Sequence, residues 1–306
     1  MQPEQDAGGA GTGFGHRAAG GDAAAALPGP ARSPGAGPWR TGRLTMRDGD
    51  PAFEALRDAH VAALTGSLID GVAHGPGGAG YVWSRSIPDP TLNFAYGVRR
   101  PDQFAWAGAA ALGRDRAPAF LARDAEEVAL LRALFEPAIL RPARWMVARP
   151  PPAPSPADGA VTLQATPAPG PDFEGVFANL SDDPAVRTHL RRTYLPALRA
   201  AKARPGLAPL HLVLRDAAGP AACASLYLRG DMAGLYNLGT RVDRQGRGLG
   251  TAVTRAALHA ARARGATRVF LHVFPHGPAG GALAALATRA GFRAVCAPIL
   301  LGTSPP

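Results

Sequence analysis

Apolar positions in the second half of the chain recur with strand-like and helix-like spacing in turn. They predict strands at 161–166, 210–215, 222–228, 235–242, 268–273 and 292–301, and helices at 172–180, 183–203, 248–264 and 280–290. Pro196 is expected to kink or break the second helix, because proline removes a helical hydrogen bond. This order predicts a mixed α/β layer rather than regular βαβ winding.

The first half of the chain repeats the end of that order in weaker form. Strands are expected at 91–98, 118–122 and 144–148, with helices at 104–113 and 125–135. The strands at 91–98 and 235–242 begin two similar series of elements. We interpret this as an internal duplication.

Two segments poor in apolar periodicity divide the chain. Residues 1–41 are rich in Gly, Ala and Pro and have no period of two or 3.6, so we expect a disordered tail. Residues 150–158 hold five prolines and are expected to form a linker. The folded domains are therefore predicted at 42–149 and 159–306.

Charge changes this picture little. The net charge is +10, but Lys202 is the single lysine among 33 basic residues, so much of the excess reflects a general preference for arginine. The excess lies in residues 151–306, with 17 basic and 8 acidic residues, and it leaves a nucleic-acid partner open as an alternative that has no recognition motif behind it. The two cysteines, Cys223 and Cys296, predict no disulfide framework. With no apolar run long enough to cross a bilayer and no leader-like N-terminus, we expect a cytoplasmic protein without a membrane partner.

The segment 235–251 carries the sharpest chemical signal. A predicted strand runs into a glycine-rich loop, and the loop opens an amphipathic helix. Glycines let main-chain N–H groups approach an anion, and the helix N-terminus adds free donors and positive potential. Arg244 and Arg247 lie beside the same loop. No Lys-Ser/Thr pair follows Gly250, and the spacing of Gly246, Gly248 and Gly250 does not fit a dinucleotide fingerprint, so a P-loop and a Rossmann site are both disfavoured.

The run Gln245-Gly246-Arg247-Gly248-Leu249-Gly250 fits [QR]-x-x-G-x-[GA], and Gly291-Phe292 follows before the last strand. This pattern and the order of elements over about 160–302 resemble the GCN5-related N-acetyltransferase (GNAT) family. The resemblance implies a mostly antiparallel central sheet flanked by helices and an acetyl-CoA or other acyl-CoA cofactor. Its expected cofactor-binding residues are Leu238, Gly239, Thr240, Gln245, Gly246, Arg247, Gly248, Leu249, Gly250 and Thr251.

The resemblance is weaker for the catalytic residues. Where the family often has a tyrosine acid and an asparagine, this chain has Ala287 and Gly280. Tyr227 and Tyr236 lie on predicted central strands, where they could line the cleft or act as the acid. Asp231, in the predicted turn between these strands, is a candidate base.

Two histidines, His211 and His276, are further candidates for the base. His272 and His276 have the spacing of a metal pair, but Pro275 interrupts the segment, and we expect no metal site. We therefore expect direct transfer of an acyl group from acyl-CoA to a primary amine of a small molecule or peptide. The alternative is a non-catalytic acyl-CoA-binding or scaffold protein of the same fold. The predicted N-terminal domain lacks glycines at the corresponding loop, 98–103, and is expected to shape the cleft without binding CoA.

Overall fold

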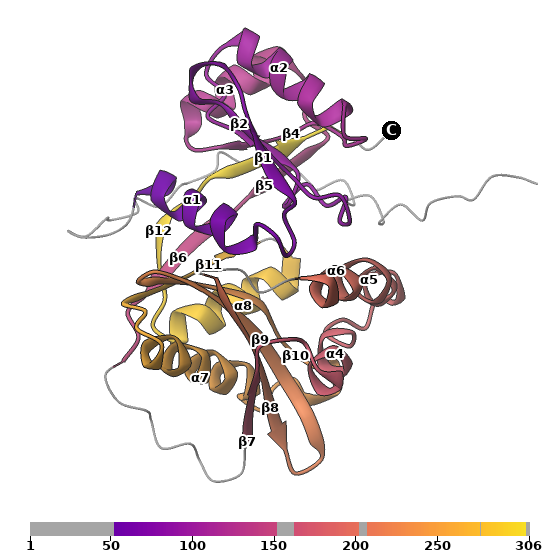
Figure 1. The fold of residues 1–306 in the computed structure, drawn as a ribbon, viewed down its shortest axis with the longest axis vertical. Coiled ribbons are helices and arrows are strands. Elements are labelled where there is room, and N and C mark those ends of the chain that lie inside the picture. Colours follow the sequence, from indigo (N-terminus) through magenta and orange to yellow (C-terminus); the bar gives the residue numbers. More distant parts are fainter. Residues whose placement is uncertain (1–51, 152–161, 202–206, 276, 304–306) are drawn as a thin grey trace, which may run out of the picture. The chain divides into compact units, whose positions relative to one another are not determined.

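The computed structural model describes residues 52–151, 162–201, 207–275 and 277–303, which belong to one compact unit. The predicted tail and most of the predicted linker lie outside the described residues. Two mostly antiparallel sheets with flanking helices form the fold (Figure 1). The expectation of a mixed α/β architecture is confirmed.

The smaller sheet is built mainly from the first half of the chain. Its strand order is β1 (Gly71–His74), β2 (Gly80–Trp83), β3 (Phe94–Tyr96), β4 (Ala119–Ala122), β13 (Ile299–Gly302) and β5 (Ile139–Pro142). The short helix η1 (Pro76–Gly78) joins β1 and β2, and α2 (Pro101–Leu112) and α3 (Ala125–Leu134) flank the sheet. Strands β3 and β4 run parallel, because α2 connects them as a crossover.

The larger sheet carries the candidate site. Its order is β12 (Arg293–Cys296), β6 (Arg144–Ala148), β11 (Arg268–Val273), β10 (Met232–Thr240), β9 (Gly219–Arg229), β8 (Ala208–Asp216) and β7 (Thr162–Thr166). Apolar residues of α7 (Leu249–Ala263) and α8 (Gly277–Arg289) pack on one face. Helices α1 (Phe53–Leu64) and α4 (Pro171–Phe177) pack on the other, so a helix from the first half of the chain covers the sheet of the second.

The two sheets also exchange their last strands. Strand β6 lies between β11 and β12 in the larger sheet, and β13 lies between β4 and β5 in the smaller one. The single strand expected at 292–301 is therefore wrong: Pro298 interrupts it, and its two parts, β12 and β13, join different sheets. Each sheet thus contains one strand from the other side of the proline-rich segment, and the division into 42–149 and 159–306 stays a prediction.

Most other expected elements are present with shifted ends. The helix expected at 183–203 consists of α5 (Pro184–His189), a π-helical turn η2 (Leu190–Tyr194) and α6 (Leu195–Ala200). The π turn precedes Pro196, whose missing N–H removes one regular helical bond. Helix α1 and strands β1, β2 and β5 were not expected from the pattern. Within the described part of the chain, every helix is too short or too polar to span a bilayer.

Candidate functional site

The site begins where the two central parallel strands separate. Strands β10 and β11 pair at three positions and stop at Gly234 and Phe270. Beyond this point β10 also shifts its register against β9 between Tyr236 and Gly239, and Asn237 takes a left-handed φ of 51°. Such a bulge bends a strand away from its neighbour. Main-chain groups at the end of β10 therefore face the gap between the strands instead of a partner strand.

A buried polar network holds this bulge. The side-chain amide of Asn237 donates to Ser225 Oγ at 3.0 Å, and His211 Nδ1 lies 2.9 Å from the same oxygen. The thiol of Cys223 contacts the main-chain oxygen of Asn237 at 3.4 Å. Burial lowers the pKa of His211 to about 4, so the ring is neutral at neutral pH. His211 therefore supports the backbone beneath the site, and it is not among the residues that line the cavity described below.

An open glycine loop follows β10. Gly246 and Gly248 both have φ near 77°, and a Cβ at either position would meet no atom within 4 Å. Gly248 is also the N-cap of α7 and supplies no side-chain hydrogen bond, so the first-turn N–H groups of this 15-residue helix lack a cap. This combination of free donors, helix dipole and unobstructed backbone fits an anionic group such as a pyrophosphate.

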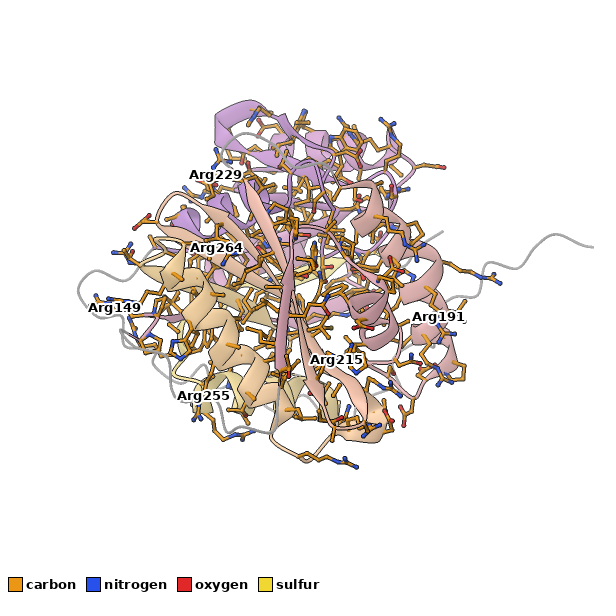
Figure 2. The ribbon with its side chains drawn as sticks, turned by 60° about the horizontal axis from the view of Figure 1, so that its bottom comes forward. Arg149, Arg191, Arg215, Arg229, Arg255 and Arg264 are labelled. Carbon is orange, nitrogen blue, oxygen red and sulfur yellow. The ribbon has the colours of Figure 1, made fainter. Side chains whose placement is uncertain are left out.

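The arginines beside the loop differ in their availability. Arg244 pairs with Asp243 at 3.2 Å and with Asp216 at 3.5 Å, so much of its charge is neutralised. Arg241 also pairs with Asp243, at 3.0 Å. Arg247 is exposed and forms no ion pair with the residues that the structure describes. Of the further arginines labelled in Figure 2, Arg229, Arg255 and Arg264 lie on one side of the ribbon in this view, and Arg191 lies on the other.

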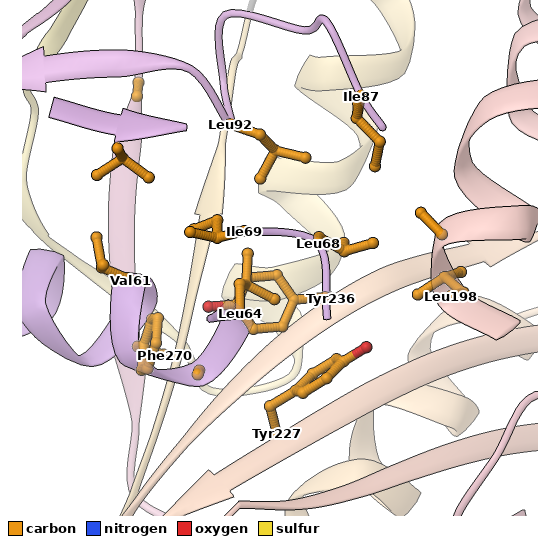
Figure 3. Packing of buried hydrophobic residues seen from close by; sticks show 14 of the residues in the cluster. Val61, Leu64, Leu68, Ile69, Ile87, Leu92, Leu198, Tyr227, Tyr236 and Phe270 are labelled. Atoms are coloured by element: carbon orange, nitrogen blue, oxygen red, sulfur yellow. The ribbon is translucent and has the colours of Figure 1, made fainter. Parts of the chain in front are cut away.

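A cavity of about 250 Å³ occupies the gap between β10 and β11. One wall consists of Leu235, Leu238, Leu271, Val273 and Leu283, from the two strands and α8. The other wall includes residues that precede β3 in sequence. The members from that part of the chain are His60, Leu64, Leu68, Thr91 and Leu92. Figure 3 shows Leu64 and Leu68 together with Tyr236 in the buried cluster at this place. The two halves of the chain therefore build one cavity.

Three polar rings meet in this cavity: those of His60 and Tyr236, which are buried, and that of His272, which is partly buried. Tyr236 Oη lies 3.0 Å from His60 Nδ1, and the rings of His60 and His272 are 5.0 Å apart and nearly perpendicular. Burial lowers the pKa of His272 to about 4, against an opposing effect of Asp89, and burial and His272 lower that of His60. Burial raises the pKa of Tyr236 well above its usual value. At neutral pH the two imidazoles are thus neutral and the phenol is protonated. The buried Nδ1 of His272 has no hydrogen-bond partner among the described residues.

The carboxylate of Asp89 lies behind one wall of the cavity. Tyr194 donates to Asp89 Oδ2 at 3.4 Å, and Thr91 donates to Oδ1 of the same carboxylate at 3.1 Å. Burial and the neighbouring Asp89 raise the pKa of Tyr194 well above its ordinary value. Tyr194 and Thr91 line the cavity, whereas Asp89 itself does not. The carboxylate therefore orients two hydroxyl groups at the cavity wall.

The other residues expected to be catalytic lie farther away. Tyr227 is buried, and its hydroxyl accepts a hydrogen bond from Ser67 at 3.4 Å; its ring packs edge-on against Tyr236. Asp231 is exposed in the turn before β10 and accepts a hydrogen bond from Thr267 at 2.9 Å. Since a strand rises about 3.3 Å per residue, Asp231 is roughly 13 to 23 Å along β10 from the strand's cavity-lining residues, Leu235 to Leu238. We therefore leave Asp231 out of the site. His276 lies outside the described residues.

The residues expected to hold the cofactor fall in one stretch of backbone. Leu238, Gly239 and Thr240 form the end of β10, Gln245, Gly246, Arg247 and Gly248 form the loop, and Leu249, Gly250 and Thr251 begin α7. The structure explains both departures from the family pattern. Ala287 is fully buried against the sheet, and a Cβ on Gly280 would lie 2.0 Å from the main-chain oxygen of Phe274. Position 280 therefore has no room for the larger family residue, and position 287 belongs to the buried core.

Sequence reasoning missed His60 and Asp89 and dismissed His272 together with the metal pair. His60 and Tyr236 are 176 residues apart, so no local spacing reveals their contact. A histidine among the apolar residues of 53–64 was the available signal, and it needed the prediction of α1 to be noticed.

Comparison with known proteins supports the resemblance to the GNAT family that the sequence shows. The family model described as Acetyltransferase (GNAT) family matches residues 177–292. No curated protein is significantly similar to the chain.

Solved structures with this fold cover most of the chain. A GCN5-related N-acetyltransferase from Kribbella flavida superposes with a TM-score of 0.56 and 16% identity, covering 81% of this chain and 95% of its own. A functionally unknown conserved protein from Staphylococcus epidermidis superposes with a TM-score of 0.53 and 11% identity, covering 76% of this chain and 93% of its own.

A tandem GNAT protein from the clavulanic acid biosynthesis pathway has a TM-score of 0.53 and 15% identity, covering 77% of this chain and 82% of its own. At these identities the likeness concerns the fold, which extends across both sheets. With the matched family model and the splayed strands, residues 177–292 are a domain of the GNAT acetyltransferase family.

Proposed function

We propose that the protein is an N-acyltransferase that moves an acetyl or other acyl group from acyl-CoA to a primary amine. The observation that carries this proposal is the continuous backbone from the end of β10 to the first turn of α7. Its splayed strand offers unpaired main-chain groups to an extended arm, and its open glycine loop offers N–H donors to a pyrophosphate. Leu238, Gly246 and Gly248 belong to the binding stretch, and Arg247 adds the unpaired cation.

The cavity supplies groups for the transfer itself. The bound cofactor supplies the acyl group as a thioester. The amine nitrogen forms a bond to the acyl carbon while the bond from that carbon to sulfur breaks. His272, neutral and with an unpartnered buried nitrogen, accepts a hydrogen bond from the attacking amine, and the proton that the amine loses passes to the departing sulfur. Tyr236 and His60 hold each other in place beside this step. The main-chain N–H groups near Leu238 stabilise the developing oxyanion.

Isothermal titration with acetyl-CoA tests the binding half of the proposal. In Gly248→Asp, a negative charge stands at the helix N-terminus where the pyrophosphate would bind, so affinity is expected to fall at least about tenfold. Gly265→Asp is the matched control. Gly265 follows α7, also has a left-handed φ, of 88°, and also has open space around its Cβ position. Equal affinity of the wild type and Gly248→Asp, or no binding by the wild type, contradicts the proposal.

Thiol release tests the chemical half. Incubation with acetyl-CoA and a panel of primary amines is expected to liberate free CoA thiol and yield the N-acetyl product, detected by mass spectrometry. Tight acetyl-CoA binding without thiol release for any amine would instead identify a non-catalytic acyl-CoA-binding protein. The loss of the family tyrosine at Ala287 and asparagine at Gly280 is the observation that keeps this second function open.

A further inference from the structure

The cavity between β10 and β11 has a lining that selects among amines. Of its 15 lining residues, nine are aliphatic: Leu64, Leu68, Leu92, Leu180, Leu235, Leu238, Leu271, Val273 and Leu283. The polar members are His60, Thr91, Tyr194, Tyr236, Asn237 and His272. Among the described residues, none that lines the cavity carries a full charge at neutral pH, because His60 and His272 have lowered pKa values.

The size of the cavity sets a second limit. Its volume is about 250 Å³. An apolar cavity of about 150 Å³ is enough to hold a benzene molecule. The enclosed part of this cavity, which is partly open to solvent, therefore accommodates one ring together with the reacting end of a thioester and leaves little enclosed space for a second ring.

We propose that the acceptor is a small primary amine with an apolar body of about one ring and no second charged group. This inference rests on the proposed acyl transfer and names its substrate class. Polyamines, amino sugars and lysine side chains in peptides bring additional charge or length into a wall of leucines, where an unpaired ion is costly. The single amine is tolerated because it must release its proton before it attacks. His272 and the hydroxyl groups of Tyr236 and Tyr194 provide hydrogen-bonding groups for it.

The first half of the chain sets this selectivity. Leu64, Leu68 and Leu92 lie on α1, on the turn after it, and on the segment before β3, and they close the cavity on the side opposite α8. Leu68 and Leu92 are each 4% exposed, so their side chains fill the boundary of the cavity rather than its mouth. A segment without a glycine loop of its own thereby determines which acceptor fits.

A pair of amines with the same ring tests the charge limit. We expect benzylamine to be acetylated with a kcat/KM at least about tenfold above that of para-xylylenediamine, whose second ammonium group must enter the leucine wall. Spermidine and a lysine-containing peptide are expected to be poorer still. Preference for any of these charged amines over benzylamine overturns the inference while leaving acyl transfer intact. Absence of thiol release with every amine, despite acetyl-CoA binding, contradicts the proposed function instead.

Cavity enlargement tests the size limit. In Leu68→Ala and Leu92→Ala, the ratio of kcat/KM for 1-naphthylmethylamine to that for benzylamine is expected to rise at least about fivefold, because removed methyl groups leave space for a second ring. Leu131→Ala is the matched control. Leu131 is equally buried in the first half of the chain but belongs to a different core cluster. A ratio unchanged in both cavity variants, or raised equally in Leu131→Ala, contradicts the assignment.

Discussion

The same structural unit occurs twice in this molecule, with opposite outcomes at its anion-binding end. In both sheets a strand leads through a loop into a helix and then into a parallel strand: β3, α2 and β4 in one, β10, α7 and β11 in the other. In the second unit, Gly246 and Gly248 leave the N-terminus of α7 uncapped and open. Only this unit can offer its helix N-terminus to a ligand.

In the first unit, the N-terminus of α2 is covered by residues of the same half of the chain. Gln103, 3% exposed, accepts a hydrogen bond from the main-chain N–H of Arg99 at 2.7 Å and donates to the main-chain oxygen of Pro76 at 3.0 Å. Pro101 stands in the first turn of α2, where it removes a donor. The short helix η1 thus covers the place that a phosphate occupies in the proposed function of α7. We infer that the first half is a degenerate GNAT-like domain that keeps the topology without the binding loop.

The closed half contributes to the site in another way. Helix α1 brings His60 to within 3.0 Å of Tyr236 and lines the cavity with Leu64. The difference between the halves shows that a half whose own helix N-terminus is closed can still supply residues to the cavity of the other half.

Acid is expected to give the largest effect, because neutral histidines line the shared cavity. The pKa of His272 is about 4 in the folded protein and near 6.5 in an unfolded chain. Between these values the unfolded chain binds a proton that the folded chain does not, so the free energy of unfolding falls as the pH decreases from 6.5 to 4. The loss is at most about 3 kcal/mol for this residue.

Denaturant titrations at several pH values measure this loss. His272→Asn is expected to reduce the pH dependence in that window, to which His60 and His211 also contribute. His74→Asn, which replaces an exposed histidine of β1, is the control and should leave it unchanged. Identical slopes for the wild type and His272→Asn would show that the cavity does not exclude the charged ring.

Removing the side chain of Gln103, which covers the N-terminus of α2, is expected to have the next largest effect on the free energy of unfolding. Gln103→Ala leaves the N–H of Arg99 and the carbonyl of Pro76 without their partner, which lowers the free energy of unfolding by about 2 kcal/mol. Gln245→Ala at the open loop removes one exposed bond of 3.4 Å and should change stability by less than about 0.5 kcal/mol. Acetyl-CoA affinity should not change in Gln103→Ala. Equal destabilisation by the two substitutions would contradict the contrast between a closed and an open helix end.

A smaller effect is expected at the contact between the halves. His60→Leu removes the hydrogen-bond partner of Tyr236, and we expect kcat to fall about tenfold while acetyl-CoA affinity stays the same. His60→Asn places an amide near the position of Nδ1 and should restore most of the rate. A loss of rate that is the same in both variants would indicate that His60 only fills space.

Local sequence rules predicted the open loop because its requirements are local. A left-handed φ at 246 and 248 needs glycine, and a helix N-terminus without a capping side chain is visible in the order of residues. Strand β6 was predicted with its exact bounds for the same reason, since its apolar residues fill a short run between breakers. These features depend on neighbours within a few positions.

The shared cavity depends on contacts that local rules do not describe. The pattern of β6 identifies a strand but not the sheet that it joins, and its partners in β11 are more than a hundred residues away. Likewise, β12 and β13 share one apolar run, but β12 joins the edge of the larger sheet and β13 lies between β4 and β5 in the smaller one. The place of His60 follows from this exchange of strands and from the packing of α1 on the larger sheet. Residue spacing along the sequence therefore could not predict the position of His60.

The smallest expected effect is on acetyl-CoA affinity, and it distinguishes Arg247 beside α7 from Arg100 beside α2. Arg247 is exposed and unpaired among the described residues, whereas Arg100, before α2, is paired with Asp102 at 2.8 Å. Arg247→Ala is expected to weaken acetyl-CoA binding by about three- to tenfold, because an exposed contact with a phosphate contributes about 1 kcal/mol. Arg100→Ala should not change the affinity.

The difference in acetyl-CoA affinity between wild type and Arg247→Ala should also shrink as salt is raised from about 0.05 to 0.5 M, because screening removes the arginine's contribution but leaves the main-chain donors. An equal effect of both substitutions would mean that general positive charge, rather than the open helix end, attracts the cofactor.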